Sequence, residues 1–365
     1  MLKTNKFRLY PNKKQQDLLW QDSVTCNRLY NQCLEFKKES YEKYNKNFFK
    51  FDINRKITKW RRSSDRLKLV HSQVLQQVSD RLDKTYQAFF RKNKRAGFPK
   101  FRSSCYFFSL RYPQSGYKLA DKYVQIKRYG RIKYKQHRDH LGKIKQICIK
   151  FDGQNWYISI AYEIAPNDNS PQTNSCIAID LGLTNIITDQ DGNKTPNQNH
   201  AKYYDREIGK LQSRRTKCKR NSNKYRHFSK VVRRLYGEKS RKTKDFLHKV
   251  SHDLSIKYDT VFAENLNVKN MKESVIHGLN REVSNTQFGL LLTMLGYKAK
   301  NLILVDPYNT SKKCSSCGKI NKMPLRKRIM KCKCGLIMDR DQNAAKNILC
   351  LGQARLRDLS TVVVQ

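Results

Sequence analysis

CIAIDLGLTNIITDQDG, residues 176–192, is the stretch that decides the fold of the second half of this 365-residue chain. It contains two short runs rich in β-branched residues, 176–180 and 185–189, which predict two strands paired in a hairpin. The first run ends on Asp180, and Gly182 follows two residues later. We therefore expect a carboxylate that stands free at the edge of a sheet.

The segments that follow alternate between helical and strand patterns. A basic helical stretch covers residues 206–249, which contain 17 Lys and Arg residues and only three acidic ones. After it come a strand over 260–265, a helix over 284–300, a strand over 301–307, a cysteine-containing segment and a helix over 341–349. A strand hairpin followed by alternating helices and strands predicts a mixed α/β sheet of the RNase H type.

The first half of the chain has a different pattern. Residues 3–12 alternate like a strand, residues 13–94 follow a helical period, and residues 97–164 hold several short β-runs. We expect the first strand to join the later ones in one barrel, with the helical module inserted between them. The Pro, Asn and Ser residues of segment 165–175 predict a domain boundary there.

The charge balance indicates the class of partner. The chain has 76 Lys and Arg residues against 30 Asp and Glu residues, a formal net charge of +46. Because such a charge repels itself, it favours a polyanionic partner, which indicates nucleic acid. A polycation for membranes or a ribosomal-type scaffold explains less, since no apolar run approaches about 18 residues. With eleven cysteines, an odd number, we expect a reduced, soluble, cytosolic protein.

Three acidic residues are candidates for a shared Mg²⁺ site. Asp180 and Glu264 each end a predicted strand; either alone would be read as a turn residue, but two on one sheet indicate a site. The third acid is Asp339 or Asp341, at the start of the last predicted helix. At about 100° per residue, Asp341 is in phase with the apolar Ile348, whereas Asp339 turns toward solvent or a salt bridge. We therefore select Asp341, since hydrolysis of a phosphodiester needs hard carboxylate ligands around one or two Mg²⁺ ions.

Four cysteines are spaced like the ligands of a zinc site. A C-x2-C pair and a C-x-C pair, separated by fourteen residues, consist of Cys314, Cys317, Cys332 and Cys334. The C-x-C pair is one residue shorter than the usual zinc knuckle, and Cys350 is an alternative ligand. We predict one Zn²⁺ that folds a segment too short to have a core of its own.

A cluster of basic residues lies inside the basic helical stretch over residues 206–249, which we expect to form a pair of helices. A run of like charge is usually a solvated surface, but an excess of this size predicts a surface that contacts phosphates. The residues that we expect to bind nucleic acid there are Arg214, Arg215, Lys217, Lys219 and Arg220.

Several short motifs stand in a recognisable order along nearly the whole chain. They are FRLYPNKKQ (7–15), CNRLYNQCL (26–34), GFPKFRS (97–103), IAIDLGLTN (177–185), RKTKDFLHKVSHDL (241–254), VFAENL (261–266), YNTSKKCSSCG (308–318) and DRDQNAAKNI (339–348). Together they resemble the TnpB (OrfB) family of insertion-sequence proteins, which are relatives of type V CRISPR effectors. By motif, the catalytic acids of that family fall on Asp180, Glu264 and Asp341. One departure is Asn265, where the family often has Asp.

The resemblance implies an RNA-guided DNA endonuclease that cuts target DNA beside a short flanking motif by two-metal RuvC chemistry. It implies Mg²⁺ at the three acids and Zn²⁺ at the four cysteines. The partners would be a guide RNA from the transposon end and target double-stranded DNA, with no membrane, in the cytoplasm and nucleoid of a prokaryote. The implied domains are a wedge β-barrel (1–10 and 97–172), a helical recognition lobe (11–96), a RuvC-like nuclease (173–313 and 336–365) and a zinc ribbon that binds target nucleic acid (314–335).

Three alternatives stay open. The same fold could act as an RNA-guided, DNA-bound repressor without cleavage, although the intact set of three acids disfavours this. It could be a miniature type V CRISPR effector, which differs in the source of its guide. A nuclease that reads a DNA sequence through the protein itself would replace both if no RNA were needed.

Overall fold

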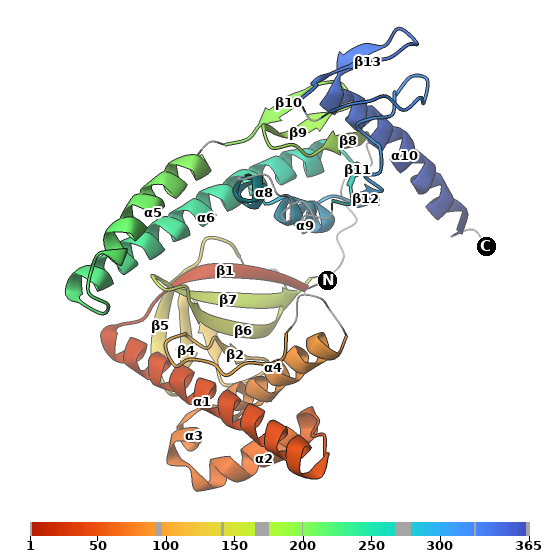
Figure 1. The fold of residues 1–365 in the computed structure, drawn as a ribbon. Coiled ribbons are helices and arrows are strands. Elements are labelled where there is room, and N and C mark those ends of the chain that lie inside the picture. Colours follow the sequence, from red (N-terminus) through yellow and green to blue (C-terminus); the bar gives the residue numbers. More distant parts are fainter. Residues whose placement is uncertain are drawn as a thin grey trace. The chain divides into compact units, whose positions relative to one another are not determined.

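The computed structural model describes residues 2–91, 97–139, 142–164, 175–198, 200–266, 279–324 and 326–362 (Figure 1). The chain divides into two compact units, residues 1–169 and 170–365. Each unit has its own sheet and its own hydrophobic core. The segment 165–174, where the sequence predicts a domain boundary, lies outside the described residues. The limits of the four domains implied by the resemblance stay predictions.

Unit 1 contains an antiparallel sheet of seven strands. They are β1 (Leu2–Tyr10), β2 (Leu110–Tyr112), β3 (Lys118–Ala120), β4 (Tyr123–Ile126), β5 (Gly130–Lys135), β6 (Lys143–Phe151) and β7 (Trp156–Glu163). Their order is β2-β6-β7-β1-β5-β4-β3, so the first strand of the chain does join the later ones, as predicted. Within the described residues no pairing connects β2 to β3, so a closed barrel stays a prediction.

The alternation of β1 explains its central place between β7 and β5. Asn5, Phe7 and Leu9 are buried, whereas Lys6 and Tyr10 are exposed. Successive side chains of a strand point to opposite faces, so one face of β1 enters the core and the other stays polar. The core of unit 1 therefore lies on the Phe7 side of the sheet, where the helices also contribute their apolar faces.

The helical part of unit 1 consists of α1 (Lys13–Tyr44), α2 (Lys50–Ser63), α3 (Asp65–Leu69) and α4 (Ser72–Phe90). α1 begins at a capping box, because the Asn12 side chain accepts from the N–H of Gln15 and the Gln15 side chain accepts from the N–H of Asn12. It ends at Asn45, whose φ of 48° is left-handed. The predicted helical module between the first strand and the later ones is therefore confirmed.

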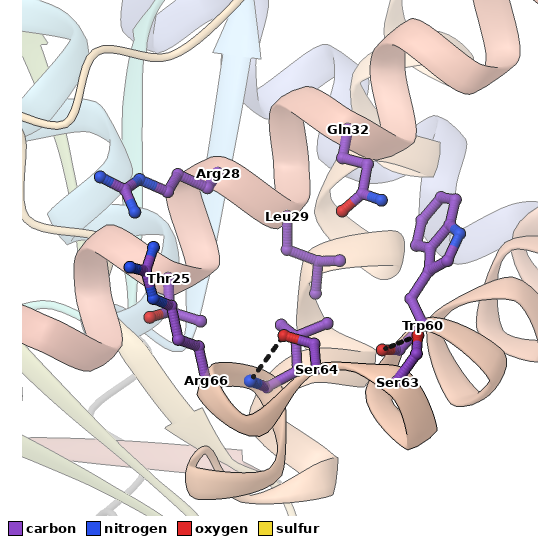
Figure 2. A pocket seen from close by; sticks show the side chains of 9 residues that line it. Thr25, Arg28, Leu29, Gln32, Trp60, Ser63, Ser64 and Arg66 are labelled. Carbon is purple, nitrogen blue, oxygen red and sulfur yellow. Dashed lines mark hydrogen bonds between the residues drawn. The ribbon is translucent and has the colours of Figure 1, made fainter.

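A pocket of about 240 Å³ opens between α1 and the connection from α2 to α3 (Figure 2). It is lined by Thr25, Arg28, Leu29, Gln32, Trp60, Ser63, Ser64, Arg66 and Leu67. Arg28 and Arg66 are exposed on one side of this pocket, and Trp60 is half-buried on the opposite side. The pocket thus combines two cations with an aromatic ring.

Unit 2 contains a mixed sheet of five strands in the order β10-β9-β8-β11-β12. The strands are β8 (Cys176–Asp180), β9 (Asn185–Asp189), β10 (Lys194–Pro196), β11 (Thr260–Glu264) and β12 (Asn301–Val305). β8 and β9 pair antiparallel, as the hairpin pattern predicts, whereas β11 is parallel to both β8 and β12. A small antiparallel pair, β13 (Ile329–Lys331) and β14 (Ile337–Asp339), is separate from this sheet.

Helices cover both faces of the parallel pair β8 and β11 (Figure 1). The described residues of unit 2 include the helices α5 (His200–Thr216), α6 (Asn223–Lys257), α8 (Leu279–Thr286), α9 (Phe288–Lys298) and α10 (Arg340–Val362). Ile177 and Val261 belong to a core shared with α6 and α9, whereas Ala178 and Phe262 pack with Ile348 of α10. Burial on both faces accounts for the continuous apolar runs of these two strands. Across the described ranges, no helix combines the length and apolar character needed to cross a membrane.

Candidate functional site

Two of the predicted acids, Asp180 and Glu264, end neighbouring parallel strands. The register pairs Ile179 of β8 with Ala263 of β11, so the next residue of each strand reaches the same carboxyl edge of the sheet. Because strand side chains alternate between faces, both acids share the face that α10 covers. Glu264 is 7% exposed and Asp180 is half-buried, so both carboxylates are largely removed from water.

The start of α10 brings the third acid to this edge. Asp341, in the first turn of the helix, is half-buried and acts electrostatically on Asp180. Asp339 instead forms an ion pair with Lys194 at 2.8 Å and accepts a hydrogen bond from the N–H of Asp341 at 2.9 Å. The structure therefore agrees with the helix phase that separated Asp341 from Asp339. The catalytic role of the three acids stays a prediction.

The electrostatics of the acidic cluster favour a bound cation. Burial, and then the carboxylates of Glu264 and Asp341, raise the pKa of Asp180 from 3.8 to about 8. Burial also raises the pKa of Glu264, although a hydrogen bond from Thr310 opposes this shift. Several carboxylates in a poorly solvated site repel one another when ionised, and a cation bound between them offsets this repulsion. The cluster of Asp180, Glu264 and Asp341 can therefore accept a divalent ion.

Thr310 contacts this cluster and was not predicted from the sequence. Its hydroxyl donates to Oε1 of Glu264 at 2.5 Å, and the threonine is only 4% exposed. It lies in the loop that follows β12, 46 residues beyond Glu264. Its place in the motif at 308–318 was the one available signal, and the motif by itself does not indicate a partner.

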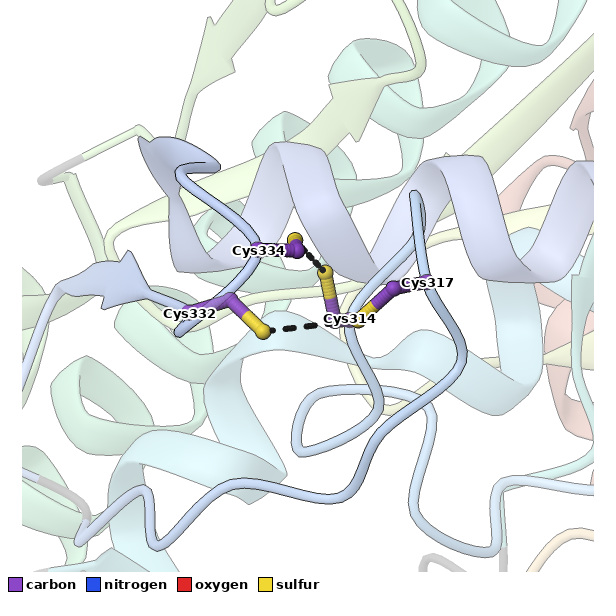
Figure 3. Close-up of side chains that lie close together, drawn as sticks. All are labelled: Cys314, Cys317, Cys332 and Cys334. Carbon is purple, nitrogen blue, oxygen red and sulfur yellow. Dashed lines mark hydrogen bonds between the residues drawn. The ribbon is translucent and has the colours of Figure 1, made fainter.

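The four predicted cysteines converge on one point (Figure 3). Their Sγ atoms all lie within 4.8 Å of one another, with 3.7 Å from Cys314 to Cys334 and 3.5 Å from Cys317 to Cys332. A tetrahedral Zn²⁺ with bonds of about 2.3 Å separates its sulfur ligands by roughly 3.8 Å, so this group fits the ion. Cys350 is exposed on α10 and is not part of the group.

A tighter turn accommodates the short C-x-C pair. In the first pair the N–H of Gly318 donates to the carbonyl of Cys314, and in the second the N–H of Gly335 donates to the carbonyl of Cys332. The second turn is therefore one residue shorter than the first. Both glycines have a positive φ, 75° and 93°, which a side chain would disfavour. The missing residue does not prevent the four sulfurs from meeting.

The predicted basic residues lie at the turn between α5 and α6. Arg214, Lys217, Lys219 and Arg220 are exposed, and Arg215 is half-buried. The guanidinium of Arg215 lies 5.6 Å from the centre of the Tyr225 ring. Elsewhere on the two helices several cations are paired with acids, for example Lys239 with Asp205. The turn is thus a concentrated positive surface, and its contact with phosphates stays a prediction.

Unit 1 has a second basic surface, which we name the basic–aromatic face: Lys6, Arg8, Tyr10, Lys135 and Tyr157. Nζ of Lys6 lies 3.6 Å from the centre of the Tyr157 ring, and the Arg8 guanidinium lies 5.5 Å from the same ring. Arg8 is the register partner of both Lys135 and Tyr157. Sequence reasoning missed this face because three strands far apart in the chain create it.

Three family models match separate stretches of the chain. Residues 159–275 match OrfB_IS605, described as "Probable transposase", and residues 288–348 match the "Cas12f1-like, TNB domain". Residues 1–46 match a model described as a helix-turn-helix domain, but here they contain one strand and one long helix, β1 and α1. The fold is similar to that of the chain in "Cryo-EM structure of the Cas12f1-sgRNA-target DNA complex", with a TM-score of 0.61 and 14% identity over 95% of this chain and 98% of that one. The molecule therefore has the mixed α/β fold of the Cas12f class.

Sequence relatives identify the family within that class. TnpB-like protein MJ0751 of Methanocaldococcus jannaschii is 30% identical over 222 residues, which cover 56% of this chain and 77% of that protein. "Putative RNA-guided DNA endonuclease InsQ" of Escherichia coli (strain K12) is 28% identical over 380 residues, 97% of this chain and 93% of that protein. The chain belongs to the TnpB (OrfB) family.

Proposed function

We propose that this protein is an RNA-guided DNA endonuclease, encoded by an insertion sequence, that cuts target DNA next to a short flanking motif. The observation that carries the proposal is the meeting of Asp180, Glu264 and Asp341 at the carboxyl edge of β8 and β11. The net charge of +46 supports a nucleic-acid substrate, and the relative from Escherichia coli has the same activity in its name. The mixed sheet supports a RuvC-like site of the RNase H type.

The acidic cluster would hold one or two Mg²⁺ ions, for which carboxylate oxygens are suitable ligands. Mg²⁺ bound there supplies an activated water and neutralises charge on the scissile phosphate. Asp180 has to lose its proton before it can act as a ligand.

The other surfaces would hold the nucleic acids. The basic–aromatic face belongs to the proposed wedge (1–10 and 97–172), and the pocket with Arg28, Trp60 and Arg66 belongs to the proposed recognition lobe (11–96). Cations bind phosphates and aromatic rings stack on bases, and both surfaces offer the two kinds of side chain, which supports a contact with guide RNA and DNA. We assign the zinc ribbon (314–335) to target nucleic acid and residues 173–313 and 336–365 to the nuclease.

Alanine variants of the three acids test the proposed cleavage site. Asp180→Ala, Glu264→Ala and Asp341→Ala should each abolish Mg²⁺-dependent cutting of a guide-matched duplex, because each removes a ligand. Guide-dependent binding should persist, since distant cations contact the phosphates. Asp339→Ala is the matched control, two residues from Asp341 and paired with Lys194, and should be much milder. Full activity of any one acid variant would exclude that residue from the site.

Exchange of the guide distinguishes the proposed enzyme from its alternatives. Replacing the targeting segment of the RNA should redirect cleavage while the protein is unchanged. Guided binding with no cutting by the wild-type protein would identify the repressor. Efficient cutting of one DNA sequence by RNA-free protein would indicate a nuclease in which the protein reads the sequence. The protein can be expressed together with the DNA that flanks its gene. Sequencing the RNA that co-purifies with it then distinguishes a guide from the transposon end from a CRISPR guide.

A multiple substitution at the α5–α6 turn tests the phosphate-contacting surface. Replacing Arg214, Arg215, Lys217, Lys219 and Arg220 by Gln should weaken binding of matched and unmatched nucleic acid alike, because phosphates carry no base identity. The slope of log affinity against log salt should fall by roughly 0.7–0.9 for each phosphate that the variant no longer neutralises. An unchanged salt slope would remove this turn from the interface.

A further inference from the structure

The loop between β12 and the cysteines contacts the acidic cluster through one side chain. The Thr310 hydroxyl has a single proton and two acceptors nearby, Oε1 of Glu264 at 2.5 Å and the carbonyl of Pro307 at 3.2 Å. The shorter contact, to a carboxylate, is the stronger one. It occupies one oxygen of Glu264 and leaves the other oxygen available for a cation. A hydrogen bond of this kind also restricts rotation of the carboxylate.

Two buried amides of α10 hold the same loop. Nδ2 of Asn347 donates to the carbonyls of Thr310 and Lys313, both at 2.7 Å. Nδ2 of Asn343 donates to the Lys313 carbonyl at 2.8 Å, and its Oδ1 accepts from the N–H of Ser315 at 2.9 Å. Asn343 is fully buried and Asn347 is 7% exposed, so both amides need these partners, and the bond from Asn347 to the Thr310 carbonyl is itself buried.

The fastened loop and α10 each contribute to both candidate metal sites. The loop carries Thr310, which contacts Glu264, and it runs directly into Cys314. α10 carries Asp341 in its first turn and the two amides in the turns that follow. Four short hydrogen bonds therefore connect the helix of the third acid to Thr310, the partner of the second acid, and to Lys313 and Ser315, the residues on either side of the first cysteine.

We propose that Thr310 is a positioning residue for Glu264, and that Asn343 and Asn347 place it by fastening its loop to α10. The same fastening holds the first cysteine pair, so the acidic cluster and the thiolate cluster share one frame. The effect on DNA cleavage rests on the proposed function, whereas the effects on metal binding do not. Removing the Thr310 hydroxyl should therefore lower the affinity of the acidic cluster for a divalent ion. Removing the Asn347 amide should lower metal binding at both the acidic cluster and the thiolate cluster.

Substitutions of Thr310 test the first half of the proposal. Thr310→Val keeps the shape and removes the hydroxyl, whereas Thr310→Ser keeps the hydroxyl. Mn²⁺ affinity is measured by calorimetry on the zinc-loaded complex with guide RNA, with Asp341→Ala as the blank for ions bound elsewhere. Thr310→Val should bind Mn²⁺ about tenfold more weakly, the size of one charge-assisted hydrogen bond. Thr310→Ser should stay within about threefold of the wild type, and zinc content should be unchanged in both.

Substitution of Asn347 tests the second half. Asn347→Leu removes the amide at similar volume and should lower both Mn²⁺ affinity and the zinc retained after dialysis against a chelator. Lys346→Ala, an exposed neighbour on the same helix, is the control and should change neither. Circular dichroism of each variant reports whether its fold is intact, and the zinc content of Thr310→Ser does so for the Thr310 pair.

Several results would overturn the proposal. They are wild-type Mn²⁺ affinity in Thr310→Val, failure of Thr310→Ser to preserve affinity, unchanged zinc retention in Asn347→Leu, or no Mn²⁺ bound by the wild type above the Asp341→Ala blank. If the wild type binds Mn²⁺ but cuts no guide-matched DNA, the proposed function fails instead. The positioning role is then still decided by the affinities of the Thr310 variants.

Discussion

Binding of a divalent ion to the acidic cluster should release a proton from Asp180. With a pKa of about 8, Asp180 is about nine-tenths protonated at pH 7 and about one-tenth protonated at pH 9. Because the ion binds the carboxylate form, we expect about 0.9 proton released per binding event at pH 7 and about 0.1 at pH 9. The raised pKa of Glu264 acts in the same direction.

Calorimetry in two buffers with different ionisation enthalpies measures this release directly. The apparent heat of Mn²⁺ binding changes with the buffer in proportion to the protons released. Asp180→Asn should lose the release together with the affinity. Burial raises the pKa of Asp339, but hydrogen bonds from Lys194 and two backbone N–H groups outweigh it and leave this pKa lowered. Asp339→Asn should therefore leave the release unchanged. A release near zero at pH 7, or equal at both pH values, would refute the raised pKa of Asp180.

The metal-free protein should lose stability as the pH rises, because the folded pKa of Asp180 is raised above its unfolded value and the folded state keeps the proton between about pH 4 and pH 8. In that window Asp180 by itself lowers the free energy of unfolding by at most about 1.4 kcal/mol per pH unit, and hydrogen exchange of β8 in Asp180→Asn should lack this contribution. Gly352→Ala should destabilise unit 2 by about 1–3 kcal/mol in urea, because an added Cβ would lie 2.2 Å from the Phe262 ring. Gly209→Ala in α5, which would meet nothing within 4 Å, should instead stabilise it by up to about 1 kcal/mol; equal effects would contradict the packing argument. Cys317→Ser should lower a zinc content of about one ion per chain in elemental analysis, and full zinc in that variant would remove Cys317 from the site.

Local periodicity was enough to place the acids and the cysteines. A strand that ends on an acid puts a carboxylate at a sheet edge, which located Asp180 and Glu264 before any pairing was known. A helical repeat relates residues one turn apart, which separated Asp341 from Asp339. Cysteine spacing located the thiolate cluster, although it did not show that a tighter turn at Gly335 accommodates the C-x-C pair. These features depend on backbone geometry over a few residues, which the sequence expresses directly.

The partners of these side chains were decided by the tertiary structure. Thr310 reaches Glu264 over 46 residues, and Lys194 reaches Asp339 over 145. The basic–aromatic face requires β1 to lie between β5 and β7, an order that alternation within a strand does not specify. Sequence periodicity determines which face of an element is buried, because that depends on neighbours a few residues away. Which buried faces meet, and which polar groups then pair between them, depends on strand order, register and loop path, and only the packed chain determines those.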